Sequence, residues 1–282
     1  MKVDVYWGQA LAKAKDHFDA VSTGLADLSW VITVYTPGRF MASEIIMLAF
    51  LGFPDSKTAT TVLWDLYEKF PAMQKEYEDV KVLVLHSGDP GQLSTSRKPI
   101  RTANDIKGVK IRAVAGPPSG AVKRMGAVPI PMPINDIYPS MEKGVMEGFF
   151  LDLQGTKTRK LYEVANYFTM VNMYALPFAV VMNKKRWESI PPDLQKQIMT
   201  VSGREGSMWW AKKYDGQAEE SLHILKTTAG KKVIYPGPAE FQTFIDAGKE
   251  TWGEYVKKME AKGMPGQAMF DEMRRLLKKY KK

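Results

Sequence analysis

The sequence predicts an α/β protein made of two lobes, with one long helix that spans both of them. Strand-like apolar runs alternate with segments of helical periodicity along most of the chain, a pattern typical of α/β layers. At 282 residues the chain is long enough to build two packed cores. A helical pattern that begins after Pro191 and Pro192 continues past Leu225, so this helix is long enough to contact both lobes.

The first lobe is expected to alternate strands and helices, which predicts parallel strand pairs. The segment 41–53 is apolar, but it contains Glu44 and is too short to cross a bilayer, so we expect it in the core. The strand over 80–86 is continuously apolar, as in strands covered on both faces. In chain order, the expected elements are a strand over 3–7, a helix over 11–23, a strand over 28–34, helices over 60–70 and 73–78, and the strand over 80–86.

The second lobe is expected to begin where the turn-forming segment 87–91 interrupts this pattern. Residues 109–153 repeat the strand–helix alternation, and a buried strand over 177–183 returns the chain to the first lobe. A short strand over 232–235 precedes a helical tail that begins near residue 238 and is interrupted at 263–266. The predicted division assigns residues 1–89 and 177–216 to the N-terminal lobe, and residues 90–176 and 217–282 to the C-terminal lobe.

Composition and charge exclude several classes of function. The formal net charge is +9, but the basic residues are scattered and follow no nucleic-acid-binding motif. We therefore expect no nucleic-acid partner, and we expect the positive field to attract an anion. The chain contains no cysteine, which excludes disulfides, thiolate zinc sites and cysteine nucleophiles.

The sequence offers no catalytic machinery. His17, His86 and His223 lie on separate expected elements without metal-ligand spacing. No nucleophile elbow, phosphate-binding loop or dinucleotide-binding glycine pattern occurs. We expect neither an enzyme nor a bound metal or cofactor.

Arg112 is the first candidate for a binding residue. It lies on an expected strand that alternates charged and apolar residues. An arginine among apolar neighbours is costly unless an anion meets it, and its planar fork of donors suits a carboxylate. This pattern suggests a buried acid-binding site. A structural ion pair, or a solvent-exposed arginine at the end of the strand, explains the same pattern.

The motifs around Arg112 resemble those of a known family. They are Lys-Gly-Val-Lys-Ile-Arg (107–112), Met-Gly-Ala-Val-Pro-Ile-Pro-Met (125–132), Asp-Ile-Tyr (136–138) and Gly-Val-Met-Glu-Gly (144–148). In this order and spacing they are similar to DctP-type solute-binding proteins of tripartite ATP-independent periplasmic (TRAP) transporters. The resemblance extends from Val5 to about residue 260.

The resemblance implies a two-lobe fold like that of periplasmic binding proteins, hinged around an organic acid whose carboxylate pairs with Arg112. It also implies TRAP membrane subunits as partners and a periplasmic location. The start of the chain lacks the apolar segment of an export signal, so we expect that signal to have been removed or not included. By comparison with the family, we expect this chain to lack the first strand–helix unit of the N-terminal lobe. We expect a monomer.

Departures from the family pattern bear on the ligand. Gln92 stands where other members often have a second arginine, Phe150 and Leu151 belong to a triplet that is usually polar, and Ile134 replaces an aromatic residue. Fewer polar partners favour a monocarboxylate with an apolar or aromatic body, because a hydroxylated ligand would leave polar groups unpaired.

The remaining candidates are less specific. Trp7, Trp30, Phe150 and Met132 are candidate walls of the site, although aromatic and methionine side chains at such positions also occur as plain core. Arg39 could replace the missing second arginine or lie in solvent as a turn residue, and Tyr138 is a secondary candidate. A stand-alone protein that binds or senses organic acids is the alternative function.

Overall fold

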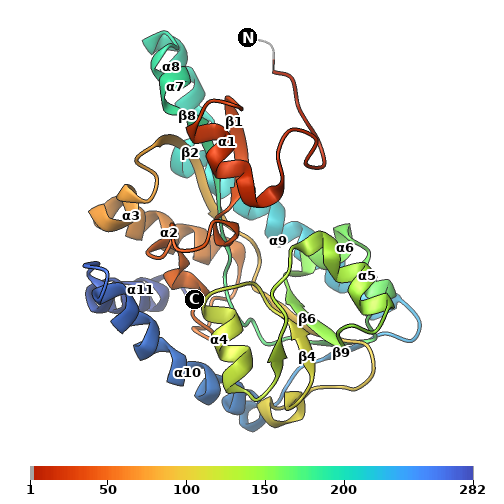
Figure 1. Ribbon diagram of the computed structural model, residues 1–282. Helices are drawn as coiled ribbons and strands as arrows, with labels where there is room; N and C mark the ends of the chain where they lie inside the picture. Colours follow the sequence, from red (N-terminus) through yellow and green to blue (C-terminus); the bar gives the residue numbers. More distant parts are fainter. Residues whose placement is uncertain (1–2, 282) are drawn as a thin grey trace.

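Two separate β-sheets organise the molecule, one in each lobe (Figure 1). The computed structural model describes residues 3–281. In that part of the chain the first sheet has the order β1-β8-β2 and the second has the order β5-β4-β6-β3-β7-β9. This confirms the predicted α/β fold of two lobes.

The first sheet is antiparallel. It comprises β1 (Leu28–Ile32), β8 (Pro177–Asn183) and β2 (Val80–Ser87). The returning strand β8 lies between the other two and runs antiparallel to both. The expected parallel pairs are therefore wrong for this lobe, because β8 separates β1 from β2. The segment 41–53 lies in the core as expected, with Ile45, Ile46 and Leu48 fully buried.

The second sheet is mixed and carries Arg112. β4 pairs in parallel with both β5 and β6, and β7 pairs in parallel with β9. β3 runs antiparallel to β6 and β7. The strands are β3 (Gln92–Thr95), β4 (Lys110–Arg112), β5 (Val128–Pro129), β6 (Gly148–Leu151), β7 (Tyr167–Thr169) and β9 (Lys232–Ile234).

Helices cover both sheets. The α-helices are α1 (His17–Ser22), α2 (Ser56–Lys69), α3 (Pro71–Lys75), α4 (Pro117–Arg124), α5 (Ile137–Glu142), α6 (Leu153–Thr158), α7 (Lys184–Glu188), α8 (Pro192–Thr200), α9 (Gly203–Thr227), α10 (Pro238–Glu260) and α11 (Gly266–Tyr280). Short 3-10 helices are η1 (Ala14–Asp16), η2 (Thr33–Tyr35), η3 (Ser43–Met47), η4 (Ala103–Ile106), η5 (Ile134–Asp136) and η6 (Leu161–Glu163).

Helix α9 spans both lobes, as the sequence predicts. It packs against α2 and β2 in the first lobe and against α6 and β9 in the second. Two contacts fix it to the first lobe: Asp215 accepts hydrogen bonds from the N–H groups at the start of α2, and the Ser207 hydroxyl accepts one from Leu85. The helix does not begin at residue 192. α8 ends at Thr200, and α9 begins at Gly203, whose φ of +60° lets the chain turn at the start of the helix.

The amino-terminal segment differs from the prediction. Residues 3–7 form no strand and are exposed, with Val3 and Trp7 showing 68% and 81% of their surface. A strand needs a partner for its backbone hydrogen bonds, and within residues 3–281 no strand pairs with this segment. The expected helix over 11–23 is reduced to η1 and α1.

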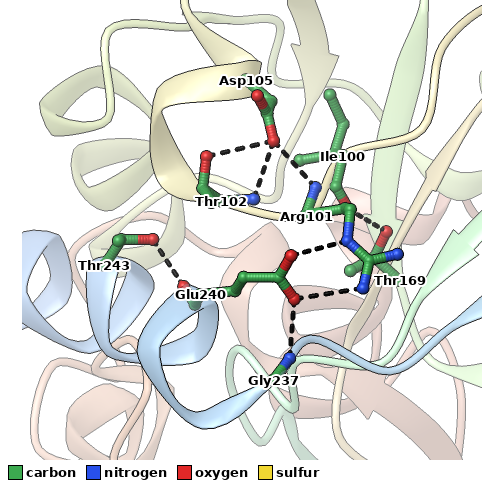
Figure 2. A network of polar contacts seen from close by, with 8 residues as sticks. All are labelled: Ile100, Arg101, Thr102, Asp105, Thr169, Gly237, Glu240 and Thr243. Carbon is green, nitrogen blue, oxygen red and sulfur yellow. Dashed lines mark hydrogen bonds and ion pairs between the residues drawn. The ribbon is translucent and has the colours of Figure 1, made fainter.

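Helix α10 begins in the second lobe and ends in the first. Figure 2 shows its first turn: the Glu240 carboxylate accepts hydrogen bonds from the Gly237 N–H and the Arg101 guanidinium, and the Thr243 hydroxyl donates to the Glu240 carbonyl oxygen. The same hydroxyl accepts a hydrogen bond from the Ala103 N–H. Farther along, Tyr255 lies in the core of the first lobe. α11 then packs against α2 of the first lobe, although the predicted division assigned 217–282 to the second. That division stays a prediction.

The close approach of α10 to the 49–50 segment predicts a strict need for glycine at position 248. A Cβ at Gly248 would lie 2.7 Å from Phe50 Cδ2 and 2.8 Å from the Ala49 carbonyl oxygen. We expect Gly248→Ala to lower the free energy of unfolding by about 1–3 kcal/mol, because backbone atoms cannot move aside cheaply. Denaturant unfolding measures the change.

The matched control is Gly253→Ala in the same helix. A Cβ there would meet no atom within 4 Å, so alanine should be neutral or stabilise the helix by up to about 1 kcal/mol. Equal stabilities of the two variants would contradict the close contact.

Candidate functional site

A cavity of about 320 Å³ lies between the two lobes. Two thirds of its lining residues lie in segments that follow strands: 34–37 after β1 in the first lobe, and 114–115 and 131–133 after β4 and β5 in the second. The others belong to the segment 9–15, which precedes β1. Ligand sites of α/β proteins commonly lie at the carboxyl ends of strands. The lining residues are Gln9, Lys13, Ala14, Lys15, Val34, Tyr35, Pro37, Val114, Ala115, Pro131, Met132 and Pro133.

The cavity is suited to a small and largely apolar molecule. Most of its walls are aliphatic or proline side chains, and its volume is at the low end for small-molecule sites. The polar side chains are Tyr35, Gln9 and two exposed lysines, Lys13 and Lys15. The carboxamide oxygen of Gln9 already accepts a hydrogen bond from Ala14.

Arg112 lies directly behind one wall of this cavity. Its side chain is only 1% exposed. Nε and Nη2 donate to the carbonyl oxygen of Met132 at 3.1 and 3.0 Å, and Nη1 donates to that of Phe150 at 3.1 Å. Because Met132 lines the cavity, a single residue separates the guanidinium from the cavity.

The charge of Arg112 is not neutralised by an ion pair. A guanidinium has five N–H groups, and three of them donate to carbonyl oxygens. The other two have no carbonyl or carboxylate acceptor among residues 3–281, and Arg112 forms no salt bridge there. Neither alternative explanation of the sequence pattern fits, since Arg112 is neither paired with an internal acid nor exposed to solvent.

Two buried carboxyl groups accompany Arg112. Burial raises the pKa of Asp152, while the Gly155 N–H and the positive charge of Arg112 act in the opposite direction. Burial, and next the charge of Asp152, raise the pKa of Asp89 well above its usual range. Asp89 accepts a hydrogen bond from Leu153. Burial thus disfavours the charged form of both carboxyl groups, and neither of them forms an ion pair with Arg112.

Gln92 is a structural residue in this arrangement. Its Nε2 donates to the Pro90 carbonyl and to Asn172 Oδ1, at 2.9 and 2.6 Å. Its Oε1 accepts from the N–H groups of Val171 and Asn172. The carboxamide is thus fully used in joining the crossing segments of the chain, and we do not assign it to the ligand.

Phe150 contacts the site through its backbone, whereas Leu151 is a core residue. Both side chains are buried in the cores of the second lobe. The carbonyl oxygen of Phe150 accepts hydrogen bonds from Arg112 and from the Tyr174 hydroxyl, at 3.1 and 3.3 Å. Ile134 also contributes its backbone, since its N–H donates to the Tyr35 hydroxyl oxygen at 3.0 Å.

Three other predicted residues lie away from the cavity. Trp7 is on the exposed amino-terminal segment. Arg39 donates to Asp79 at 2.5 Å, and its guanidinium carbon lies 4.1 Å from the ring centre of Phe18. The Tyr138 hydroxyl donates to Glu163 at 3.0 Å. None of the three lines the cavity, so the geometry does not support a binding role for Arg39 as a second arginine.

Trp30 belongs to an aromatic cluster in the first lobe. Its Nε1 donates to Nε2 of His86 at 3.2 Å, and its ring centre lies 4.8 Å from that of Phe178. His86 is fully buried and stacks on Trp210 of α9 at 5.1 Å. This cluster joins the first sheet to the helix that spans both lobes.

Sequence reasoning missed several residues of the cavity, above all Tyr35. It also missed Val34, Val114 and Ala115, which directly follow β1 and β4. Their position after strands was the available signal, because the carboxyl ends of strands carry ligand sites. Their residue types gave no hint of a binding role.

Two kinds of site or segment are absent from the described part of the chain. Residues 3–281 contain no group of three or more histidine, aspartate or glutamate side chains that could hold a metal ion. Among the helices formed by these residues, none has the length and apolar character needed to cross a membrane.

Comparison with known proteins decides the family. The model of the bacterial extracellular solute-binding proteins of family 7, DctP, matches residues 1–259. The chain belongs to this family. It is thus a member of a family of solute-binding proteins that serve in transport.

Solved structures and curated relatives agree with this family-7 assignment. A TRAP solute-binding protein from Rhodoferax ferrireducens, solved with copurified benzoate, has a TM-score of 0.89 and 25% identity over 94% of this chain and 83% of its own. A TRAP periplasmic solute-binding protein from Desulfovibrio salexigens has a TM-score of 0.85 and 33% identity over 99% and 86%. The 2,3-diketo-L-gulonate-binding periplasmic protein YiaO of Escherichia coli is 26% identical over 94% of this chain and 78% of its own.

The buried histidine of this family-7 protein predicts a pH dependence of stability. Burial lowers the pKa of His86 from 6.5 to about 4. Below pH 6.5 the unfolded chain binds a proton that the folded protein does not, so the free energy of unfolding falls as the pH drops from 6.5 to 4. The loss from this group amounts to up to about 3 kcal/mol.

Denaturant unfolding at pH 7 and pH 4.5 tests this dependence. Wild type should lose more stability between these two pH values than His86→Gln, which has no group to protonate there. The matched control, His223→Gln, changes an exposed residue of α9 and should keep the wild-type pH dependence. The same loss in wild type and His86→Gln would refute the assignment.

Proposed function

We propose that this protein binds an organic acid with one carboxylate and an apolar or aromatic body in the cavity between its lobes. The guanidinium of Arg112 pairs with the carboxylate, and the aliphatic and proline side chains of the cavity cover the body. The observation that carries this proposal is a fully buried guanidinium, without an ion-pair partner in the described residues, directly behind an apolar cavity.

Electrostatics favour an anionic ligand at this position. A buried charge is costly when it lacks a counter-charge. The carbonyl oxygens of Met132 and Phe150 satisfy three N–H groups of Arg112 but bring no net charge. A carboxylate supplies both the missing negative charge and further acceptors for the N–H groups of the guanidinium.

Access to Arg112 requires a movement of its cover. Because the side chain is 1% exposed and donates to the Met132 carbonyl, the segment 131–133 has to shift for a ligand to reach it. Hinge motion between two lobes is a common means of opening and closing such a site. The carboxylate then joins or replaces the Met132 carbonyl as the acceptor.

The composition of the cavity favours an apolar body over a hydroxylated one. Its side chains offer few partners for hydroxyl groups, and each unpaired polar group of a buried ligand is costly. The benzoate found in the Rhodoferax ferrireducens structure supports an aromatic acid. The name of the Escherichia coli relative indicates a sugar acid instead, and that ligand class is the competing candidate.

The proposal includes delivery of the acid to the membrane subunits of a TRAP transporter from a periplasmic location. Its support is the family assignment and the TRAP solute-binding proteins among its structural neighbours. A stand-alone sensor would bind the same acid but would not drive its uptake by reconstituted TRAP subunits, so uptake into proteoliposomes distinguishes the two.

Loss of the guanidinium should remove most of the affinity. We expect Arg112→Ala to weaken binding of benzoate, phenylacetate or mandelate, whichever wild type binds most tightly, by about 2–5 kcal/mol, as for other truncated buried charge pairs. Isothermal titration calorimetry measures this change. Circular dichroism checks that the variant is folded.

The matched control is Arg101→Ala, which removes an exposed arginine whose ion pair with Glu240 lies outside the cavity. It should bind the acid as wild type does. Unchanged affinity of Arg112→Ala would overturn the assignment of the carboxylate to this residue.

The ligand class can be tested separately by thermal shift. A bound ligand raises the melting temperature of the folded protein. We expect benzoate, phenylacetate and mandelate to raise it, and succinate and glucuronate at equal concentration to leave it unchanged. Stabilisation by succinate or glucuronate alone would reject the apolar monocarboxylate.

A further inference from the structure

A tyrosine of the first lobe faces the same cavity as the cover of Arg112. Tyr35 is the last residue of η2, which directly follows β1. It is half-buried and lines the cavity between the lobes. Its hydroxyl reaches the second lobe, where its oxygen accepts a hydrogen bond from the Ile134 N–H at 3.0 Å.

This contact leaves the hydroxyl hydrogen of Tyr35 available as a donor. A phenol can accept hydrogen bonds and donate one. Its oxygen accepts from Ile134, but among residues 3–281 no acceptor receives its hydrogen. Because the Ile134 N–H donates to the hydroxyl oxygen, this contact holds the hydroxyl in place without using its hydrogen. The hydrogen can therefore be donated to an acceptor on the ligand.

The Tyr35 hydroxyl lies close to the Arg112 cluster. Ile134 is two residues after Met132, whose carbonyl accepts from Nε and Nη2 of Arg112. A negative charge on Tyr35 would also raise the pKa of Tyr174, and the Tyr174 hydroxyl shares the Phe150 carbonyl with Arg112. Tyr35 and Arg112 therefore approach the same small region from opposite lobes.

We infer that Tyr35 is a second contact for the ligand carboxylate, donating its hydroxyl hydrogen from the first lobe while Arg112 donates from the second. This inference rests on the proposed function. A carboxylate has two oxygens with about four acceptor positions, so both donors can bind it together. The ligand carboxylate then links the two lobes. Because both donors reach it only when the lobes are close together, the affinity for the acid depends on closure.

The variant Tyr35→Phe removes the hydroxyl and keeps the ring. Calorimetry measures the affinities of wild type and of the variant for three acids and for their amides. The acids are benzoate, phenylacetate and mandelate, and the amides are benzamide, phenylacetamide and mandelamide. We expect the variant to bind the tightest acid about 10- to 100-fold more weakly, as for a lost hydrogen bond to a charged group. The amide of that acid should lose less than the acid does, at most about tenfold, because its carbonyl oxygen is a neutral acceptor for the hydroxyl hydrogen.

The amide series separates recognition of the headgroup from a general loosening of the site. A purely structural role through Ile134 would weaken acids and amides by the same factor, and that result would overturn the inference. So would unchanged binding of the acids. The control Tyr280→Phe removes a half-buried hydroxyl that donates to Asp65 at 2.7 Å, outside the cavity, and should leave both series unchanged.

Failure of the proposed function gives a different result. Two results would reject the proposed pairing of the ligand carboxylate with Arg112: wild type binds none of the acids, or Arg112→Ala binds them as wild type does. The inferred role of Tyr35 would then be rejected as well. If Arg112→Ala loses binding while Tyr35→Phe keeps the wild-type preference for acid over amide, only the inference about Tyr35 is rejected.

Discussion

The burial of one cationic side chain without a counter-charge sets the character of the site. Arg112 is the largest fully buried side chain of the described residues, and the main-chain carbonyl oxygens of Met132 and Phe150 accept its hydrogen bonds. Such a group is expensive unless an anion compensates it. The neighbouring acids Asp89 and Asp152 form no ion pair with it, and burial raises the pKa of both. The proposed selectivity for an acid rests on this absence of an internal ion-pair partner for Arg112.

Much of the fold was predictable because its signals are local. The continuous apolar strands at 80–86 and 177–183 and the proline that opens α10 left clear patterns. The antiparallel first sheet was not predictable from periodicity, because strand order depends on where β8 inserts. The break before α9 also escaped prediction, since a glycine within a helical pattern does not reveal its own φ.

Residues of the candidate site could be predicted where a residue type is unusual in its sequence context, and could not be predicted where that type is frequent. An arginine in an apolar strand is unusual, so Arg112 stood out. Arg39 carries the same chemistry but pairs with Asp79, and only the fold reveals that partner. Gln92 likewise looked free in the sequence, yet four hydrogen bonds engage its carboxamide. Tyr35 gave no signal because tyrosines are frequent, and its position depends on two lobes meeting.

Two continuous helices cross from one lobe to the other, and this limits how the molecule can deform. The 23-residue helix α10 starts beside Arg101 and ends in the first core, so neither lobe can swing without curving it. Helices bend gently over a large radius and resist sharp kinks. In the proposed hinge motion, opening of the lobes would therefore bend α10, and the resistance of the helix to bending would oppose it. The bending stiffness of α10, rather than the length of a flexible loop, would then limit the amplitude of the proposed hinge motion.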